Sequence, residues 1–133
     1  MNKSTVSKLA SLVVALIAGV IALLQQGATG EDWSPSRDEA WVEVSATVYK
    51  VLPDDTRGSQ HQRFLVRSPG GQSLLIAHNI DLAPRVPLSQ GDTLLINGQF
   101  EYNDKGGVIH WTHHDPQGRH DGGFIELNGK RYR

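Results

Sequence analysis

Cysteine is absent from this 133-residue chain, and its absence excludes several kinds of site. Without thiols the protein has no disulfides, zinc–thiolate sites, iron–sulfur clusters or thiol nucleophile. An excess of one charge is also lacking, because 13 Lys and Arg face 14 Asp and Glu. The first thirty residues hold two Lys and no acid, so the remainder has eleven basic against fourteen acidic residues, a net charge of −3. A general polyanion binder is therefore disfavoured, although a local basic groove is compatible with this charge.

Helical periodicity is missing beyond residue 30, where no segment carries ten residues of it. Hydrophobic residues make up 38% of the chain and charged residues 20%, which excludes wholesale disorder and a multi-span membrane protein. The length leaves about one hundred residues for one small core after the N-terminal segment. These proportions predict a single domain that is all-β or nearly so.

The N-terminal thirty residues have the pattern of an export segment. Lys3 and Lys8 precede an uncharged apolar run, Leu9–Leu24, and small residues follow at Ala28 and Gly30. This pattern predicts an apolar helix that is either a signal peptide, cleaved before residue 31, or an uncleaved N-terminal membrane anchor. In both cases we expect the domain outside the cytoplasm, periplasmic or otherwise exported, or anchored in the inner membrane by this segment alone.

A polar linker, residues 31–40, leads to a domain over residues 41–133 in which apolar side chains alternate with a period of two. This alternation predicts strands. They cover residues 41–49, 62–67, 73–78, 93–102 and 108–113. Asn128-Gly129 predicts a tight terminal hairpin, and Gly98 inside a strand predicts a bulge or bend. The fold expected is a small five-stranded OB-like Greek-key barrel with an added C-terminal hairpin; an SH3-like barrel or a short sandwich is the alternative.

Two motifs carry a resemblance to a known family. They are HNIDLAPRVP over residues 78–87 and HWTHHDP over residues 110–116, with GRH at 118–120 and GGF at 122–124. Between Trp41 and Tyr132 the chain resembles a family of small exported bacterial proteins that is catalogued as a domain of unknown function. The resemblance implies an exported OB-like barrel, and it implies no reaction, substrate or catalytic residue.

The histidines between residues 110 and 120 allow three interpretations. The first is a divalent metal site, for example for zinc, since imidazole and carboxylate suffice as zinc ligands. Its candidate ligands are His113, His114, His120 and Asp121. His78 from a neighbouring strand could complete the set.

The second interpretation is a His- or metal-dependent hydrolase, in one form acting on phosphodiesters. His113 or His114 would serve as general base, Asp115 would orient it, and Arg85 or Arg119 would hold the phosphate. The third gives these polar side chains structural roles as partners for backbone groups in a tight loop. The sequence leaves open which interpretation holds and whether any reaction is catalysed.

The function that the sequence favours is a binding module for an extended polar or anionic ligand, either nucleic acid or oligosaccharide, as OB grooves bind both. The candidate ligand-binding residues are His78, Asp81, Arg85, His110, Thr112, Arg119, Arg63 and Arg67. Trp111 alternates with Ile109, which predicts that Trp111 packs in the core. A structural protein of the envelope that presents a sheet edge to a partner is a further alternative, and the oligomeric state is left open.

Overall fold

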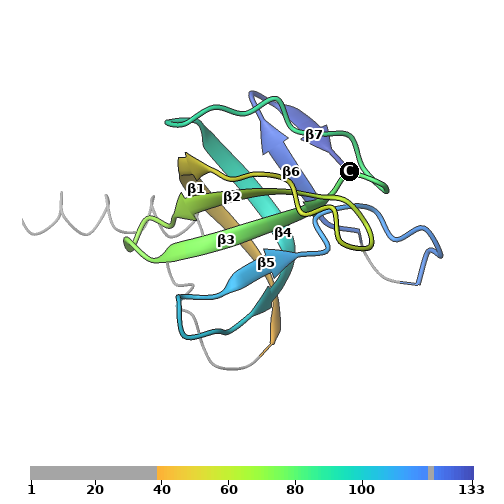
Figure 1. Ribbon diagram of the computed structural model, residues 1–133, viewed down its shortest axis with the longest axis horizontal. Coiled ribbons are helices and arrows are strands. Elements are labelled where there is room, and N and C mark those ends of the chain that lie inside the picture. The colour runs from red at the N-terminus through yellow and green to blue at the C-terminus, as the bar shows by residue number, and fades with distance from the viewer. Residues whose placement is uncertain (1–38, 120–121) are drawn as a thin grey trace, which may run out of the picture. The chain divides into compact units, whose positions relative to one another are not determined.

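All regular structure in the described part of the chain, residues 39–119 and 122–133, consists of strands (Figure 1). The computed structural model has β1 (Ala40–Val51), β2 (His61–Arg67), β3 (Ser73–Asn79), β4 (Thr93–Glu101), β5 (Val108–His110), β6 (Phe124–Leu127) and β7 (Lys130–Tyr132). The predicted apolar helix, the export segment and most of the linker lie outside the described residues. In the part that is described, no helix has the length and apolar character needed to cross a membrane.

The first five strands close into a barrel. Their order around it is β1-β2-β3-β5-β4, and the pairing of β4 with β1 closes the ring. β3 and β5 run parallel, whereas the other neighbouring pairs are antiparallel. This is the strand arrangement of the five-stranded Greek-key OB barrel. The predicted OB-like barrel is therefore confirmed.

The barrel interior is filled by the apolar side chains of alternate strand positions. The buried apolar residues of β1 to β5 are Val42, Val44, Ala46, Val48, Phe64, Val66, Leu74, Ile76, Leu94, Ile96, Phe100 and Ile109. Burying a side chain of this size stabilises the fold by about 1.5–3 kcal/mol relative to exposure. The absence of disulfides is thus compensated by a continuous core, as the period-two pattern predicts.

The added C-terminal hairpin is also confirmed. β6 pairs with β7, and the turn between them places Asn128 at φ 52° and Gly129 at φ 80°. Both angles lie in the left-handed region that a two-residue type I′ turn requires. Because β6 pairs with β4 as well, the hairpin extends the sheet beyond the closed ring.

The structure has no bulge at Gly98, and the last long strand of the barrel is shorter than predicted. Pairing between β1 and β4 continues without a register shift through Gly98, so no bulge lies there; the shift occurs in β1, between Val48 and Lys50. Gly98 is needed instead for close approach, because a Cβ there would lie 2.5 Å from the carbonyl oxygen of His110. The strand predicted to reach residue 113 ends at His110, since the next residue, Trp111, has a φ of 59°.

Candidate functional site

The site lies at the interval between β5 and β6 along one edge of β4. β5 and β6 both pair antiparallel with the edge of β4 that β1 leaves open: His110 lies opposite Gln99, and Phe124 opposite Asn97. The chain leaves the sheet after His110 and returns at Phe124. We call this segment the site loop; residues 111–119 and 122–123 of it are described.

The base of the site loop is narrow. The backbone N–H of Gly123 donates to the carbonyl oxygen of His113 at 2.9 Å, which joins the two arms of the loop. A Cβ on Gly123 would overlap the carbonyl oxygens of Trp111 and Asn97 and lie 3.0 Å from Cα of Thr112. Only glycine permits this approach, so the loop leaves the barrel from a tightly packed base.

Trp111 lies at the point where the chain leaves the sheet. Its side chain is 45% exposed, so the prediction that Trp111 packs in the core beside Ile109 is wrong. The positive φ of Trp111 breaks the strand alternation, which explains why Ile109 is buried while Trp111 is exposed. A bulky residue in the left-handed region is strained by about 1–3 kcal/mol, and such strain is concentrated at functional sites.

His113 supports the Trp111 ring from within the loop. The two rings are stacked, with centroids 6.1 Å apart and an interplanar angle of 21°. Nδ1 of His113 lies 2.7 Å from the carbonyl oxygen of His114, which can only accept, so Nδ1 carries the proton. In the neutral ring the Nε2 atom then keeps its lone pair as an acceptor.

His78 and Thr112 anchor the loop to the barrel. His78 is completely buried, and its Nε2–H donates to the carbonyl oxygen of Pro84 at 2.9 Å. Its Nδ1 accepts from the hydroxyl of Thr112 at 2.7 Å. Both residues were predicted to bind ligand, yet neither lines a pocket, because each is fully buried and bonded to the other.

Burial lowers the pKa of His78 below its usual value of 6.5, and the neighbouring His113 and His61 act in the same direction. The hydrogen bond to Pro84 opposes this shift only in part. A lowered pKa means that the unfolded chain takes up this proton more readily than the folded chain. The contribution of His78 to stability is therefore complete above about pH 6.5 and decreases as the pH falls toward the lowered folded-state value.

We expect the urea midpoint of unfolding to decrease between pH 7.5 and pH 5. His114→Gln, which removes an exposed imidazole, should leave this dependence unchanged, whereas His78→Gln should reduce it. The carboxyls with lowered pKa, Asp54 and Asp55, titrate below this range and do not interfere. A midpoint that is constant or increases on acidification would contradict the neutral, buried state of His78.

The carboxylate of Asp115 accepts hydrogen bonds from the backbone of its own loop. Its carboxylate accepts the N–H groups of Gln117 at 2.9 Å and Arg119 at 2.8 Å. Since Nδ1 of His113 is held by a carbonyl, the predicted arrangement of Asp115 orienting His113 is not formed. His114 is exposed. The proposed metal ligands His120 and Asp121 lie outside the described residues, and among those described no three His, Asp or Glu side chains form a metal-binding group.

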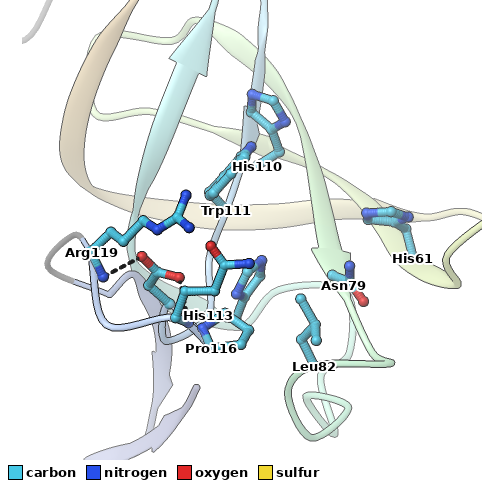
Figure 2. A pocket seen from close by; sticks show the side chains of 10 residues that line it. His61, Asn79, Leu82, His110, Trp111, His113, Pro116 and Arg119 are labelled. Atoms are coloured by element: carbon cyan, nitrogen blue, oxygen red, sulfur yellow. Dashed lines mark hydrogen bonds between the residues drawn. The ribbon is translucent and has the colours of Figure 1, made fainter.

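Two pockets lie beside the site loop. The smaller, of about 400 Å³, is shown in Figure 2 and is lined by His61, Asn79, Leu82, His110, Trp111, His113, Asp115, Pro116, Gln117 and Arg119. The larger, of about 920 Å³, is lined by Trp41, Asn97, Gln99, Trp111, Gly118, Arg119, Gly122 and Phe124. Because Trp111 and Arg119 line both pockets, we call the pair of pockets the Trp111 groove.

The sequence also matches a family. Over residues 12–133 it matches the family described as Protein of unknown function (DUF3465). The chain belongs to this family. The matched range includes the barrel, the hairpin and every residue of the Trp111 groove, and the predicted membership of a family of unknown function is confirmed. No curated protein and no solved structure matches the chain.

The remaining predicted binding residues lie outside both pockets of this DUF3465 protein. Arg85 pairs with Asp54, which lowers the pKa of Asp54 and raises that of Arg85. Asp81 accepts the backbone N–H of Gln60 at 3.0 Å. These two residues hold the segment after β3 against the loop between β1 and β2.

Arg63 and Arg67 lie on β2 and are also engaged. Nε of Arg63 donates to the carbonyl oxygen of Pro53 at 3.1 Å, and the guanidinium of Arg67 lies 4.4 Å from the centre of the Tyr49 ring. Of the eight predicted binding residues, only His110 and Arg119 line the groove.

Four amides are among the groove residues that the sequence did not single out as site residues. Asn97 and Gln99 line the larger pocket from β4, and Asn79 and Gln117 line the smaller pocket. Except for Leu95, the outward positions of β4 are polar in the alternating pattern, which is the one available signal. That pattern does not distinguish a pocket wall from an ordinary solvated face.

Proposed function

We propose that this domain binds an oligosaccharide along the Trp111 groove. The observation that carries the proposal is the position of Trp111, which is exposed, strained and shared by both pockets. An exposed indole is a flat apolar surface on which the C–H face of a sugar ring can pack. Holding that surface at a cost in backbone strain is understandable if the surface contacts a ligand.

A second indole supports a sugar ligand. Trp41 is 44% exposed and lines the larger pocket with Trp111. Its Nε1–H donates to Oδ1 of Asn97 at 2.9 Å, and the Asn97 amide donates to Glu43 at 3.3 Å. The indole is therefore held by its neighbours beside an amide that has a fixed orientation. Aromatic surface next to oriented amides suits a ligand that has apolar faces and many hydroxyls.

The distribution of charge favours a sugar over nucleic acid. Binding to nucleic acid needs several cations along the path of the phosphates. Arg119 is the one Lys or Arg that lines the groove among the described residues, while Arg63 and Arg67 lie on β2 with partners of their own. The net charge of −3 beyond residue 30 also opposes a polyanion.

The predicted location supports the same ligand class. The N-terminal segment indicates a domain outside the cytoplasm, where polysaccharides are abundant polymers. The groove offers no described nucleophile–base pair, since the carboxylate of Asp115 caps its loop and His113 donates to a carbonyl. We therefore propose binding without hydrolysis.

The test is a titration of purified protein with oligosaccharides of four to eight units, neutral and acidic, followed by tryptophan fluorescence and calorimetry. Single-stranded dT12 is titrated in parallel. We expect at least one oligosaccharide to bind, and Trp111→Ala to weaken its affinity by about 10- to 100-fold, the loss typical of a central aromatic contact. Trp111→Gly should bind as weakly, but it should be more stable than Trp111→Ala by about 1 kcal/mol because glycine accepts a positive φ.

Tyr102→Ala is the matched control, because Tyr102 is an exposed aromatic residue that lines neither pocket. Its affinity should equal that of the unmodified protein. Binding of dT12 that weakens with salt and is lost in Arg63→Ala and Arg67→Ala would overturn the proposal in favour of nucleic acid on β2. Failure of every oligosaccharide to bind would overturn it as well.

A further inference from the structure

Arg119 differs from the other arginines of the strands and their loops. Three of those form ion pairs, one of which, Arg131, also lies over the Phe124 ring; a fourth donates to a carbonyl, and a fifth lies on an aromatic ring. The contacts are Arg57–Asp55, Arg85–Asp54, Arg131–Glu126, Arg63–Pro53 and Arg67–Tyr49. The guanidinium of Arg119 has no hydrogen bond, ion pair or ring contact with the described residues, and Arg119 uses only its backbone N–H, toward Asp115.

The place of Arg119 makes this cation relevant to the groove. Arg119 is exposed, and it lines both the smaller and the larger pocket together with Trp111. Figure 2 shows its side chain extending from the site loop toward Trp111. A ligand that packs on the indole would therefore lie within reach of the guanidinium.

The acid that lines the smaller pocket, Asp115, is already engaged. Both carboxylate oxygens of Asp115 accept backbone N–H groups, from Gln117 and Arg119. These bonds stabilise the negative charge of Asp115 within its own turn. The guanidinium thus remains available to a charge supplied by the ligand.

Two of the three histidines that line the smaller pocket, His61 and His113, complement this cation. Nδ1 of His61 lies 2.9 Å from the carbonyl oxygen of Ser59, and Nδ1 of His113 bonds to the carbonyl of His114. Each neutral ring keeps its lone pair on Nε2, which can accept from a hydroxyl. The smaller pocket therefore combines acceptors for sugar hydroxyls with one cation at its boundary with the larger pocket.

We propose that the oligosaccharide is acidic, and that Arg119 pairs with a carboxylate of the sugar that packs on Trp111. This inference rests on the proposed function and adds the ligand class. Guanidinium and carboxylate match in geometry and can form two parallel hydrogen bonds. A single unpaired cation suits an isolated carboxylate on a sugar better than the closely spaced phosphates of a nucleic acid.

The experiment compares oligosaccharides that differ only in the carboxylate. The probes carry well-separated carboxylates: a xylotriose with one glucuronate branch and its carboxyl-reduced form, and a hyaluronan hexasaccharide, acidic at every second sugar, and its carboxyl-reduced form. For the acidic member of at least one pair we expect an affinity about tenfold higher than that of the neutral member, and we expect Arg119→Gln to remove this difference. Arg119→Lys should keep part of it, since the charge remains but the planar fork is lost. Arg57→Gln, at an exposed arginine outside the groove, is the control.

The outcomes separate the two proposals. Equal binding of acidic and neutral members, both weakened by Trp111→Ala, would overturn the proposed pairing with a carboxylate but would support the oligosaccharide site. A preference for the acid that persists in Arg119→Gln would overturn the role of Arg119. If no probe from either pair binds, the proposal of an acidic ligand is overturned. The titration with oligosaccharides of four to eight units then tests the proposed function by itself. Thermal melts of each variant show that the fold is retained.

Discussion

We expect Gly123→Ala to lower the free energy of unfolding by about 3 kcal/mol, at the upper end of the cost of overpacking. The added Cβ would overlap two carbonyl oxygens, those of Trp111 and Asn97, and would lie 3.0 Å from Cα of Thr112. All three atoms belong to the backbone, so no side-chain rotation can relieve the clash. For a domain of this size the melting temperature should fall by about 12 to 24 °C, which differential scanning calorimetry measures directly.

Gly70→Ala is the matched control for this substitution. Its Cβ would lie 2.8 Å from Oε1 of Gln72, the far end of a flexible side chain, and Gly70 has no positive φ. We expect a change within about 0.5 kcal/mol there, as for most surface positions. A Gly123→Ala protein that melts like the unmodified one would contradict the narrow base of the site loop.

The second large effect is expected for His78→Ala, with a loss of about 3 kcal/mol in the free energy of unfolding. The substitution leaves a cavity in a fully buried position and removes the ring that bonds both Thr112 and Pro84. Cavity formation and a buried carbonyl without its donor each cost about 1–3 kcal/mol or more. Urea denaturation with two spectroscopic probes gives the change in stability and tests two-state behaviour.

The hydrogen bond itself is isolated by a pair of variants at Thr112. Thr112→Val keeps the shape and removes the hydroxyl, whereas Thr112→Ser keeps the hydroxyl and removes a methyl group. We expect Thr112→Val to lose about 1–3 kcal/mol, because Nδ1 of His78 remains buried without a donor. A Thr112→Val protein as stable as the unmodified one would show that this bond does not anchor the loop.

These contacts link the stability of the barrel to the shape of the groove. Thr112 follows Trp111 directly, so the bond to His78 fixes the backbone at the residue that displays the indole. Gly123 holds the other arm of the loop against His113. A groove that is fixed before the ligand arrives loses less conformational entropy on binding.

The barrel could be predicted from the sequence because its signals are local. Period-two alternation locates the buried face of each strand, and Asn128-Gly129 locates the terminal hairpin. The break at Trp111 could not be predicted, since a positive φ at tryptophan contradicts its intrinsic preference and is imposed by tertiary packing. The role of Gly98 was misjudged for a related reason: close approach of a neighbouring backbone leaves the same sequence signal as a bulge.

The candidate site could be predicted only in part. The histidine motif correctly drew attention to the site loop, but composition could not separate His78, which is buried as an anchor, from His113, which lines a pocket. Trp41 and Asn97 meet through a bond between residues 56 positions apart, and such a contact exists only once β1 and β4 are paired. Long-range pairing therefore creates the larger pocket, and a single sequence does not reveal it.

The most direct test is to map the backbone amides that shift in ¹H–¹⁵N spectra when an acidic oligosaccharide is added. We predict shifts on both sides of the Trp111 groove, at Trp111, Arg119 and Asn97, with little change at Arg63 and Arg67 on β2. Shifts confined to the outer face of β2, or no shifts at saturating oligosaccharide, would contradict the assignment of the Trp111 groove as the binding site.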